Sequence, residues 1–209
     1  MRIAILTFDG FNELDSFIAL GLLNRLTADG WKAEIACPAS HVTSMNGVVV
    51  QAQQPLEFAN EADAVIFGSG IYTRAIGENS VLLDRLQLDP LRQLIAGQCS
   101  GTLLMARLGL LADMPACTDL STKPWVVEAG VRVVDAPFHA KGPIATAGGC
   151  LASQYLAAWM MAKRAGIEAA TRALHYAAPV GEKDEYVERL LKVVKPFLDN
   201  GGVAQTPTP

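Results

Sequence analysis

Apolar residues in the first half of the chain fall into two alternating patterns. Short continuous apolar runs, which are typical of buried strands, occupy residues 2–8, 32–37, 63–67 and 94–98. Apolar residues recur at helical spacing from about Glu13 onward and again from Ser100 to about Gly109. The segment 71–91 also carries helical periodicity. Strands that alternate with helices predict a mostly parallel sheet sandwiched by helices.

Shorter segments between and after these runs carry the same patterns. Residues 41–50 predict a small hairpin, because Asn46-Gly47 has the chemistry of a tight turn. Further strands are predicted at residues 116–118, 131–134 and 144–147, and further helices at 125–129, 151–164, 167–175 and 184–198. Residues 1–200 therefore predict a single doubly wound α/β domain, and residues 201–209 predict a flexible C-terminal tail.

Composition and charge narrow the class of protein. Hydrophobic residues make up 51% of the 209 residues and charged residues 18%, which predicts one domain with a large buried core. A net charge of −4 without clustered Lys and Arg argues against a nucleic-acid partner. Apolar runs fall short of a membrane span and the N-terminus lacks a signal-peptide pattern, so we expect a cytoplasmic protein that does not bind membranes. The four cysteines form no CxxC pair, which predicts reduced thiols and neither a metal nor another cofactor.

The segment AGQCSGT, residues 96–102, carries the strongest chemical signal. A buried strand runs there into small residues and directly into a helix, so Cys99 is expected at the tip of a sharp turn, a nucleophile elbow. A helix N-terminus stabilises a thiolate, which predicts a depressed pKa for Cys99. The alternative is an inert buried cysteine that packs as a small hydrophobic residue. The turn context favours the reactive thiol.

Five segments together resemble a known family. GQCSGTLLMARLGLL resembles the elbow of the ThiJ/PfpI superfamily, relatives of the class I glutamine amidotransferases. DGFNELD, FGSG, ACTDL and TAGGCLASQYLAAW resemble further segments of that family, in the same order and at compatible spacing. The resemblance covers nearly the whole chain and implies a flavodoxin-like fold that commonly pairs as a homodimer.

The resemblance also implies roles for individual residues. An acidic residue after the first strand contacts the elbow cysteine in relatives, and Asp15 is the matching position, as in isocyanide hydratases. Beside a thiolate, such an acid would be protonated and donate a hydrogen bond, or would move a proton. Glu13 is the alternative acid, and the alternative role for Asp15 is an ordinary first-turn residue favoured by the helix dipole.

The FGSG turn matches another part of the family site. The backbone N–H groups of the FGSG turn, with that of the residue after the cysteine, are implied to form an oxyanion pocket. The corresponding donors in this chain are Gly68, Ser69, Gly70 and Ser100.

One position departs from the family pattern. Many relatives have a histidine directly after the threonine of ACTDL, whereas this chain has Asp119 after Thr118. A Cys-His dyad is therefore not expected, and His41 and His139 match no catalytic position. The residues that remain as possible pocket neighbours are Glu13, Thr118, Asp119, Gly148, Gly149 and His175.

Two other cysteines are candidates for redox chemistry. Cys117 lies close in sequence to Asp119, and Cys150 begins a helix after Gly148-Gly149. Either thiol could resolve a sulfenic acid on Cys99 by forming a disulfide. The alternative is that both are packing or helix-cap residues.

Three functions are consistent with these residues. The first is a lyase or hydratase of the isocyanide-hydratase type, in which Cys99 attacks a small-molecule substrate and Asp15 handles protons. The second is a glyoxalase-like, deglycase-like or stress-response role for an oxidisable thiolate. The third is a non-enzymatic ligand or redox sensor, although a DNA-binding regulator is disfavoured because the chain carries no basic appendage.

Overall fold

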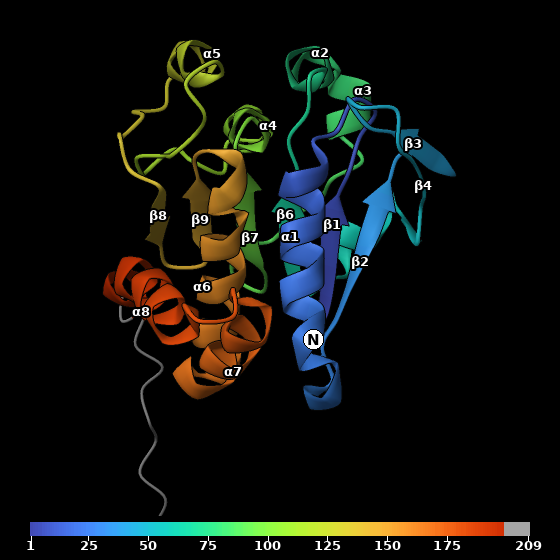
Figure 1. The fold of residues 1–209 in the computed structure, drawn as a ribbon. Coiled ribbons are helices and arrows are strands. Elements are labelled where there is room, and N and C mark those ends of the chain that lie inside the picture. The colour runs from blue at the N-terminus through green and yellow to red at the C-terminus, as the bar shows by residue number, and fades with distance from the viewer. Residues whose placement is uncertain (199–209) are drawn as a thin grey trace, which may run out of the picture.

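A seven-stranded sheet forms the centre of the molecule (Figure 1). The computed structural model describes residues 1–198, and the tail predicted at 201–209 lies outside them. In spatial order the strands are β5 (Gln54–Pro55), β2 (Lys32–Cys37), β1 (Arg2–Leu6), β6 (Ala64–Phe67), β7 (Leu94–Gln98), β9 (Ile144–Ala147) and β8 (Phe138–Lys141). All neighbouring strands are parallel except β9 and β8. The predicted doubly wound, mostly parallel sheet is therefore confirmed.

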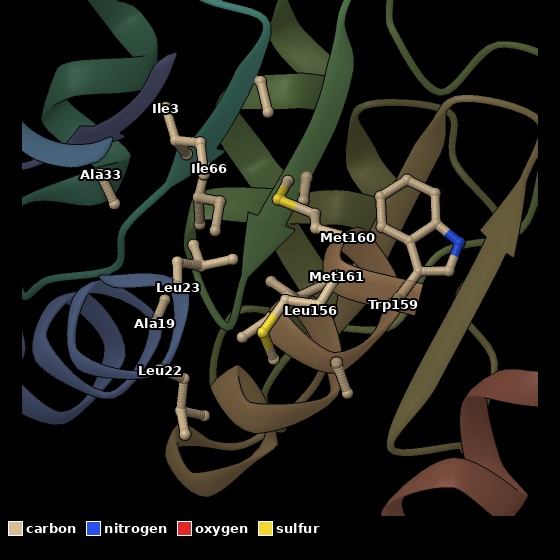
Figure 2. Close-up of a cluster of buried hydrophobic side chains, with 14 of the residues drawn as sticks. Ile3, Ala19, Leu22, Leu23, Ala33, Ile66, Leu156, Trp159, Met160 and Met161 are labelled. Carbon is tan, nitrogen blue, oxygen red and sulfur yellow. The ribbon is translucent and has the colours of Figure 1, made fainter. Parts of the chain in front are cut away.

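Helices cover both faces of this sheet, as continuous apolar strands require. One face carries α1 (Glu13–Leu23), α6 (Ser153–Ala165), α7 (Ile167–Ala177) and α8 (Lys183–Val194). The other carries η2 (Leu56–Asn60), α4 (Gly101–Arg107) and α5 (Lys123–Glu128). Strand alternation divides the core, because Ile3 and Ile5 face the first layer while Ala4 and Leu6 face the second. Figure 2 shows Ile3 and Ile66 of the sheet among side chains of α1 and α6 in the first layer.

The strand order places a candidate site. The chain passes from β1 to β2 on one side and from β6 to β7 on the other, so the order reverses between β1 and β6. In doubly wound sheets, ligands bind beyond the carboxyl ends of the strands at such a reversal. The segments that follow β1, β6 and β7 meet there, and they contain Asp15, Ser69 and Cys99.

Several predicted elements differ from the structure. Residues 116–118 and 131–134 form no strand, since one isolated bridge between Ala116 and Val133 is all that joins them. The structure has instead β8, which the sequence analysis missed because its alternating FHAK pattern is short and polar. The segment 71–91 holds two short helices, α2 (Thr73–Glu78) and α3 (Ser80–Leu83).

Short elements complete the fold. The predicted hairpin is formed by β3 (His41–Thr43) and β4 (Val49–Gln51), and η1 (Asn24–Asp29) and η3 (Cys150–Ala152) flank α1 and α6. The last predicted helix ends as α8 at Val194 and continues as the 3-10 turn η4 (Lys195–Phe197). No helix within residues 1–198 combines the length and apolarity needed to cross a membrane.

The two edges of the sheet are finished differently. β5 has only two residues, one of which is Pro55. At the other edge, the ring of Phe197 contacts both Phe138 and His139 of β8, with centroids 5.4 and 5.2 Å apart. Because neighbouring residues of a strand point to opposite faces, Phe197 lies across the edge itself.

Candidate active site

Cys99 stands on a sharp turn between β7 and α4. Its φ of 52° makes it the one non-glycine residue with a positive φ in residues 1–198. The turn is possible because α4 starts close against the end of β6. A Cβ at Gly101 would lie 2.4 Å from the carbonyl oxygen of Phe67, so only glycine fits there. The local sequence thus forces the cysteine into a strained backbone conformation of the kind found at active sites.

Asp15 reaches Cys99 from the first turn of α1. The Asn12 side chain caps this helix by accepting a hydrogen bond of 3.0 Å from the Leu14 N–H. The Asp15 side chain is nevertheless fully buried, unlike an ordinary first-turn aspartate. Its Oδ2 accepts a hydrogen bond from the Ser69 hydroxyl, and its backbone carbonyl accepts one of 2.7 Å from Ser153. Asp15 is therefore not an ordinary solvated first-turn residue whose charge offsets the helix dipole.

A third side chain completes the cluster. One carboxylate oxygen of Asp15, the Sγ of Cys99 and the Sγ of Cys150 all lie within 4.8 Å of one another. In the part of the chain that the structure describes, this is the one group of side chains that could share a metal ion, although the cysteine pattern predicts none. Asn12 Nδ2 donates a hydrogen bond of 3.1 Å to the Sγ of Cys150.

The electrostatics of this cluster correct one prediction. Burial raises the pKa of Cys99, and the nearby charges of Asp15 and Asp119 raise it further, so the predicted depression of its pKa is wrong. The cysteine is only 7% exposed, and α4 has just seven residues, too few for a strong opposing dipole. Burial likewise raises the pKa of Asp15. The two groups therefore favour sharing one proton and one negative charge.

Buried acceptors around this pair lack donors. Asp15 Oδ1, Gln98 Oε1 and Asp119 Oδ2 are buried and accept no hydrogen bond from the described residues. The other end of the Gln98 amide is bonded, because its Nε2 donates to the carbonyl of Gly149, directly before η3, at 2.8 Å. A proton on Asp15 would supply a donor where oxygen acceptors are in excess.

The predicted oxyanion donors divide into two pairs. The Gly68 N–H donates to the Leu6 carbonyl at 3.0 Å, and the Gly70 N–H donates to the Ser100 hydroxyl at 3.1 Å. The backbone N–H groups of Ser69 and Ser100 make no hydrogen bond within residues 1–198. These two are the donors free to stabilise a developing negative charge.

No histidine is among the groups that act on the Cys99 thiol in the described structure. His41 bonds Ser40 on the surface, His139 lies beside Phe197, and His175 pairs with Asp184 at 3.7 Å. His175 belongs to α7, which lies at the opposite end of the sheet from α2 and α4 (Figure 1). The structure does not bring it together with Cys99.

The alternative acid is also directed elsewhere. Glu13 accepts hydrogen bonds from the Ser44 hydroxyl and from Asn46 Nδ2, both in the hairpin segment. The Ser44 hydrogen bond lowers the pKa of Glu13. Glu13 therefore anchors the hairpin, and Asp15 is the acid of the cluster.

The remaining pocket candidates lie beside Cys99 or line a neighbouring hollow. Thr118 donates to the Cys99 carbonyl at 2.8 Å, and Asp119 Oδ1 accepts from the N–H groups of Ser121 and Thr122 at 2.9 Å. A hollow of about 470 Å³ is lined by residues that include Thr118, Asp119, Gly148 and Gly149. Cys99 and Asp15 do not line this hollow.

Sequence reasoning missed several supporting polar residues. Gln98 and Ser153 are fully buried, and Thr73 bonds the Ser100 hydroxyl at 2.9 Å. The one available signal was a polar residue at a position whose neighbours predict burial, as with Gln98 at the end of an apolar strand.

Comparisons with known proteins identify a family and a shared fold. The DJ-1/PfpI family model matches residues 1–163. Among solved structures, a ThiJ/PfpI family protein of Pseudomonas syringae is 18% identical, with a TM-score of 0.72 and coverage of 94% of this chain and 88% of its own. A mutant of a DJ-1 superfamily protein of Salmonella typhimurium is 22% identical, with a TM-score of 0.72 and coverage of 85% and 98%. DJ-1beta of Drosophila melanogaster is 21% identical, with a TM-score of 0.68 and coverage of 84% and 96%. No curated protein sequence matches the chain.

Proposed function

The chain belongs to the DJ-1/PfpI family, and from that premise we propose that it is a cysteine-dependent hydratase of small molecules, of the isocyanide-hydratase type. One observation carries the proposal: within residues 1–198 the elbow thiol is paired with a fully buried carboxyl group and with no histidine. Hydrolases of the Cys-His type need a histidine to protonate the leaving amine. Adding water across an unsaturated carbon expels no such group, so one shared proton suffices.

In the first step the thiol adds to the terminal carbon of an isocyanide. Sulfur forms a bond to that carbon, while Asp15 accepts the thiol proton and delivers it to the same carbon, which yields a thioimidate. This coupling suits a thiol whose pKa is raised by burial and by Asp15, because the thiolate need not exist beforehand.

In the second step water attacks the thioimidate carbon. Asp15 relays a proton from water to the nitrogen, and the tetrahedral intermediate collapses to an N-substituted formamide and the Cys99 thiol. The N–H groups of Ser69 and Ser100, which make no hydrogen bond within residues 1–198, would bind the oxygen of this intermediate. The net reaction consumes one substrate and one water.

The proposal is tested by incubating the purified chain with a small alkyl isocyanide and following the formamide by NMR. We expect turnover by the wild type, none by Cys99→Ala, and a loss of about 100-fold or more in Asp15→Asn. Glu13→Gln is the matched control, because it neutralises a carboxylate on the same helical turn and should retain turnover. Absence of formamide with the wild type, or full turnover by Cys99→Ala, would overturn the proposal.

A further inference from the structure

Among the described residues, Cys150 is the one thiol that shares the site with Cys99. Its Sγ lies within 4.8 Å of the Cys99 Sγ, and a disulfide requires about 2 Å between the sulfurs. Forming the bond therefore requires the two side chains to turn about their Cα–Cβ bonds and bring the sulfurs together. The proposed hydration chemistry assigns no role to Cys150.

The surroundings of Cys150 suit a resolving thiol, which reacts with a first cysteine once that cysteine has been oxidised. It is half-buried, and so more accessible than Cys99. It follows Gly149, whose φ of 88° only glycine adopts without strain, and it begins the short turn η3 that leads into α6. Burial and the charge of Asp15 raise the pKa of Cys150, and the hydrogen bond from Asn12 Nδ2 offsets part of this rise. The Asp15 carboxyl lies close enough to take the thiol proton.

The other two thiols are not placed for this reaction. Cys117 and Cys37 are almost completely buried and belong to no cluster with Cys99 among the described residues. Burial raises the pKa of Cys117 to about 12 and that of Cys37 to about 11. The sequence left Cys117 and Cys150 open as the resolving thiol, and the geometry favours Cys150.

We propose that Cys99 and Cys150 form a reversible disulfide, with hydrogen peroxide as the oxidant and a small thiol as the reductant. The Cys99 sulfur attacks one peroxide oxygen, the O–O bond breaks, and the thiol proton passes through Asp15 to the departing hydroxide, which leaves as water. The Cys150 sulfur then attacks the sulfenic acid and releases a second water. Two equivalents of a thiol restore both cysteines and leave as their own disulfide.

Trypsin separates the relevant cysteines, because Arg107, Arg132 and Lys141 place Cys99, Cys117 and Cys150 in three different peptides. The reduced full chain, kept in EDTA to remove metals, is treated with hydrogen peroxide at equimolar amount. Free thiols are then blocked with N-ethylmaleimide, sulfenic acids are trapped with dimedone, and peptides are identified by mass spectrometry.

We expect the wild type to yield a linked Cys99–Cys150 peptide pair that dithiothreitol separates. In Cys150→Ser and Cys150→Ala, dimedone labelling of Cys99 should rise several-fold, while Cys117→Ser should still form the disulfide. Two variants at position 150 guard against one that fails to fold. The proposal is overturned if wild-type Cys99 passes to sulfinic acid with Cys150 still free, or if Cys99 pairs with Cys117. These readouts need no substrate, so they are independent of the isocyanide assay.

Discussion

A thiol and a carboxyl group buried within 4.8 Å of each other cannot both carry a charge at little cost. This constraint decides how Cys99 reacts. A cysteine at a helix N-terminus is ordinarily activated by the helix dipole, but here the short α4 faces two carboxylates, Asp15 and Asp119. For the proposed reaction we therefore expect attack to proceed together with proton transfer to Asp15 rather than from a resting thiolate.

This gives a prediction for alkylation. Replacing Asp15 by Asn removes a negative charge beside Cys99, so the apparent pKa of the thiol, taken from the pH dependence of its alkylation by iodoacetamide, should fall. Asp119→Asn should act in the same direction. The measurement is the rate of Cys99 alkylation against pH, read by peptide mass spectrometry, with Glu13→Gln as the control. An apparent pKa that stays the same or rises in Asp15→Asn would contradict this account.

Single residues were predictable where local sequence determines them. The Gly-Gln-Cys-Ser-Gly run fixes the elbow, because no larger residue fits at Gly101. The direction of the Cys99 pKa was not predictable, because it depends on burial and on carboxylates from segments far apart in sequence. The same holds for the roles of Glu13 and Asp15, which differ only in which helix face meets the core.

At the scale of elements, the close contact of α4 with the end of β6 holds the elbow in place. Gly101→Ala should destabilise the protein by about 1–3 kcal/mol, because its methyl group would meet backbone oxygens that cannot move aside easily. Gly21→Ala, in the last turn of α1 with open space around it, should instead stabilise by about 0.5–1 kcal/mol. Urea denaturation followed by circular dichroism measures both changes. Equal effects of the two substitutions would contradict this account of the contact.

Elements with long apolar runs could be predicted, and short ones could not. The buried strands β1, β2, β6, β7 and β9 are read directly from their composition. β8 is four residues long and pairs at an edge, so its stability comes from β9 and from Phe197 rather than from its own sequence. Residues 131–134 have strand-like composition but find only one bridge partner.

At the scale of the whole molecule, the buried Asp15 links stability to pH. Burial raises its pKa above the unfolded value of 3.8, so the folded chain holds this proton to a higher pH than the unfolded chain. The contribution of Asp15 to the free energy of unfolding therefore falls as pH rises from about 4 through its folded pKa, and it stays low above that value.

Asp15→Asn removes this dependence. The difference in unfolding free energy between Asp15→Asn and the wild type should move in favour of the variant as pH rises across that window, since contributions of other groups cancel in the difference. Urea titrations at several pH values measure it. A difference that does not vary with pH would mean that burial leaves the pKa of Asp15 unshifted.

The edges of the sheet have a consequence for how the protein behaves at high concentration. An open strand edge exposes unpaired backbone groups that can recruit another chain and begin aggregation. Here β5 ends one side after two residues, with a proline that has no N–H to offer, and the Phe197 ring lies across β8 on the other. The turn η4 at the end of the described residues thus covers this edge, and we expect it to hinder edge-to-edge pairing of the native sheet.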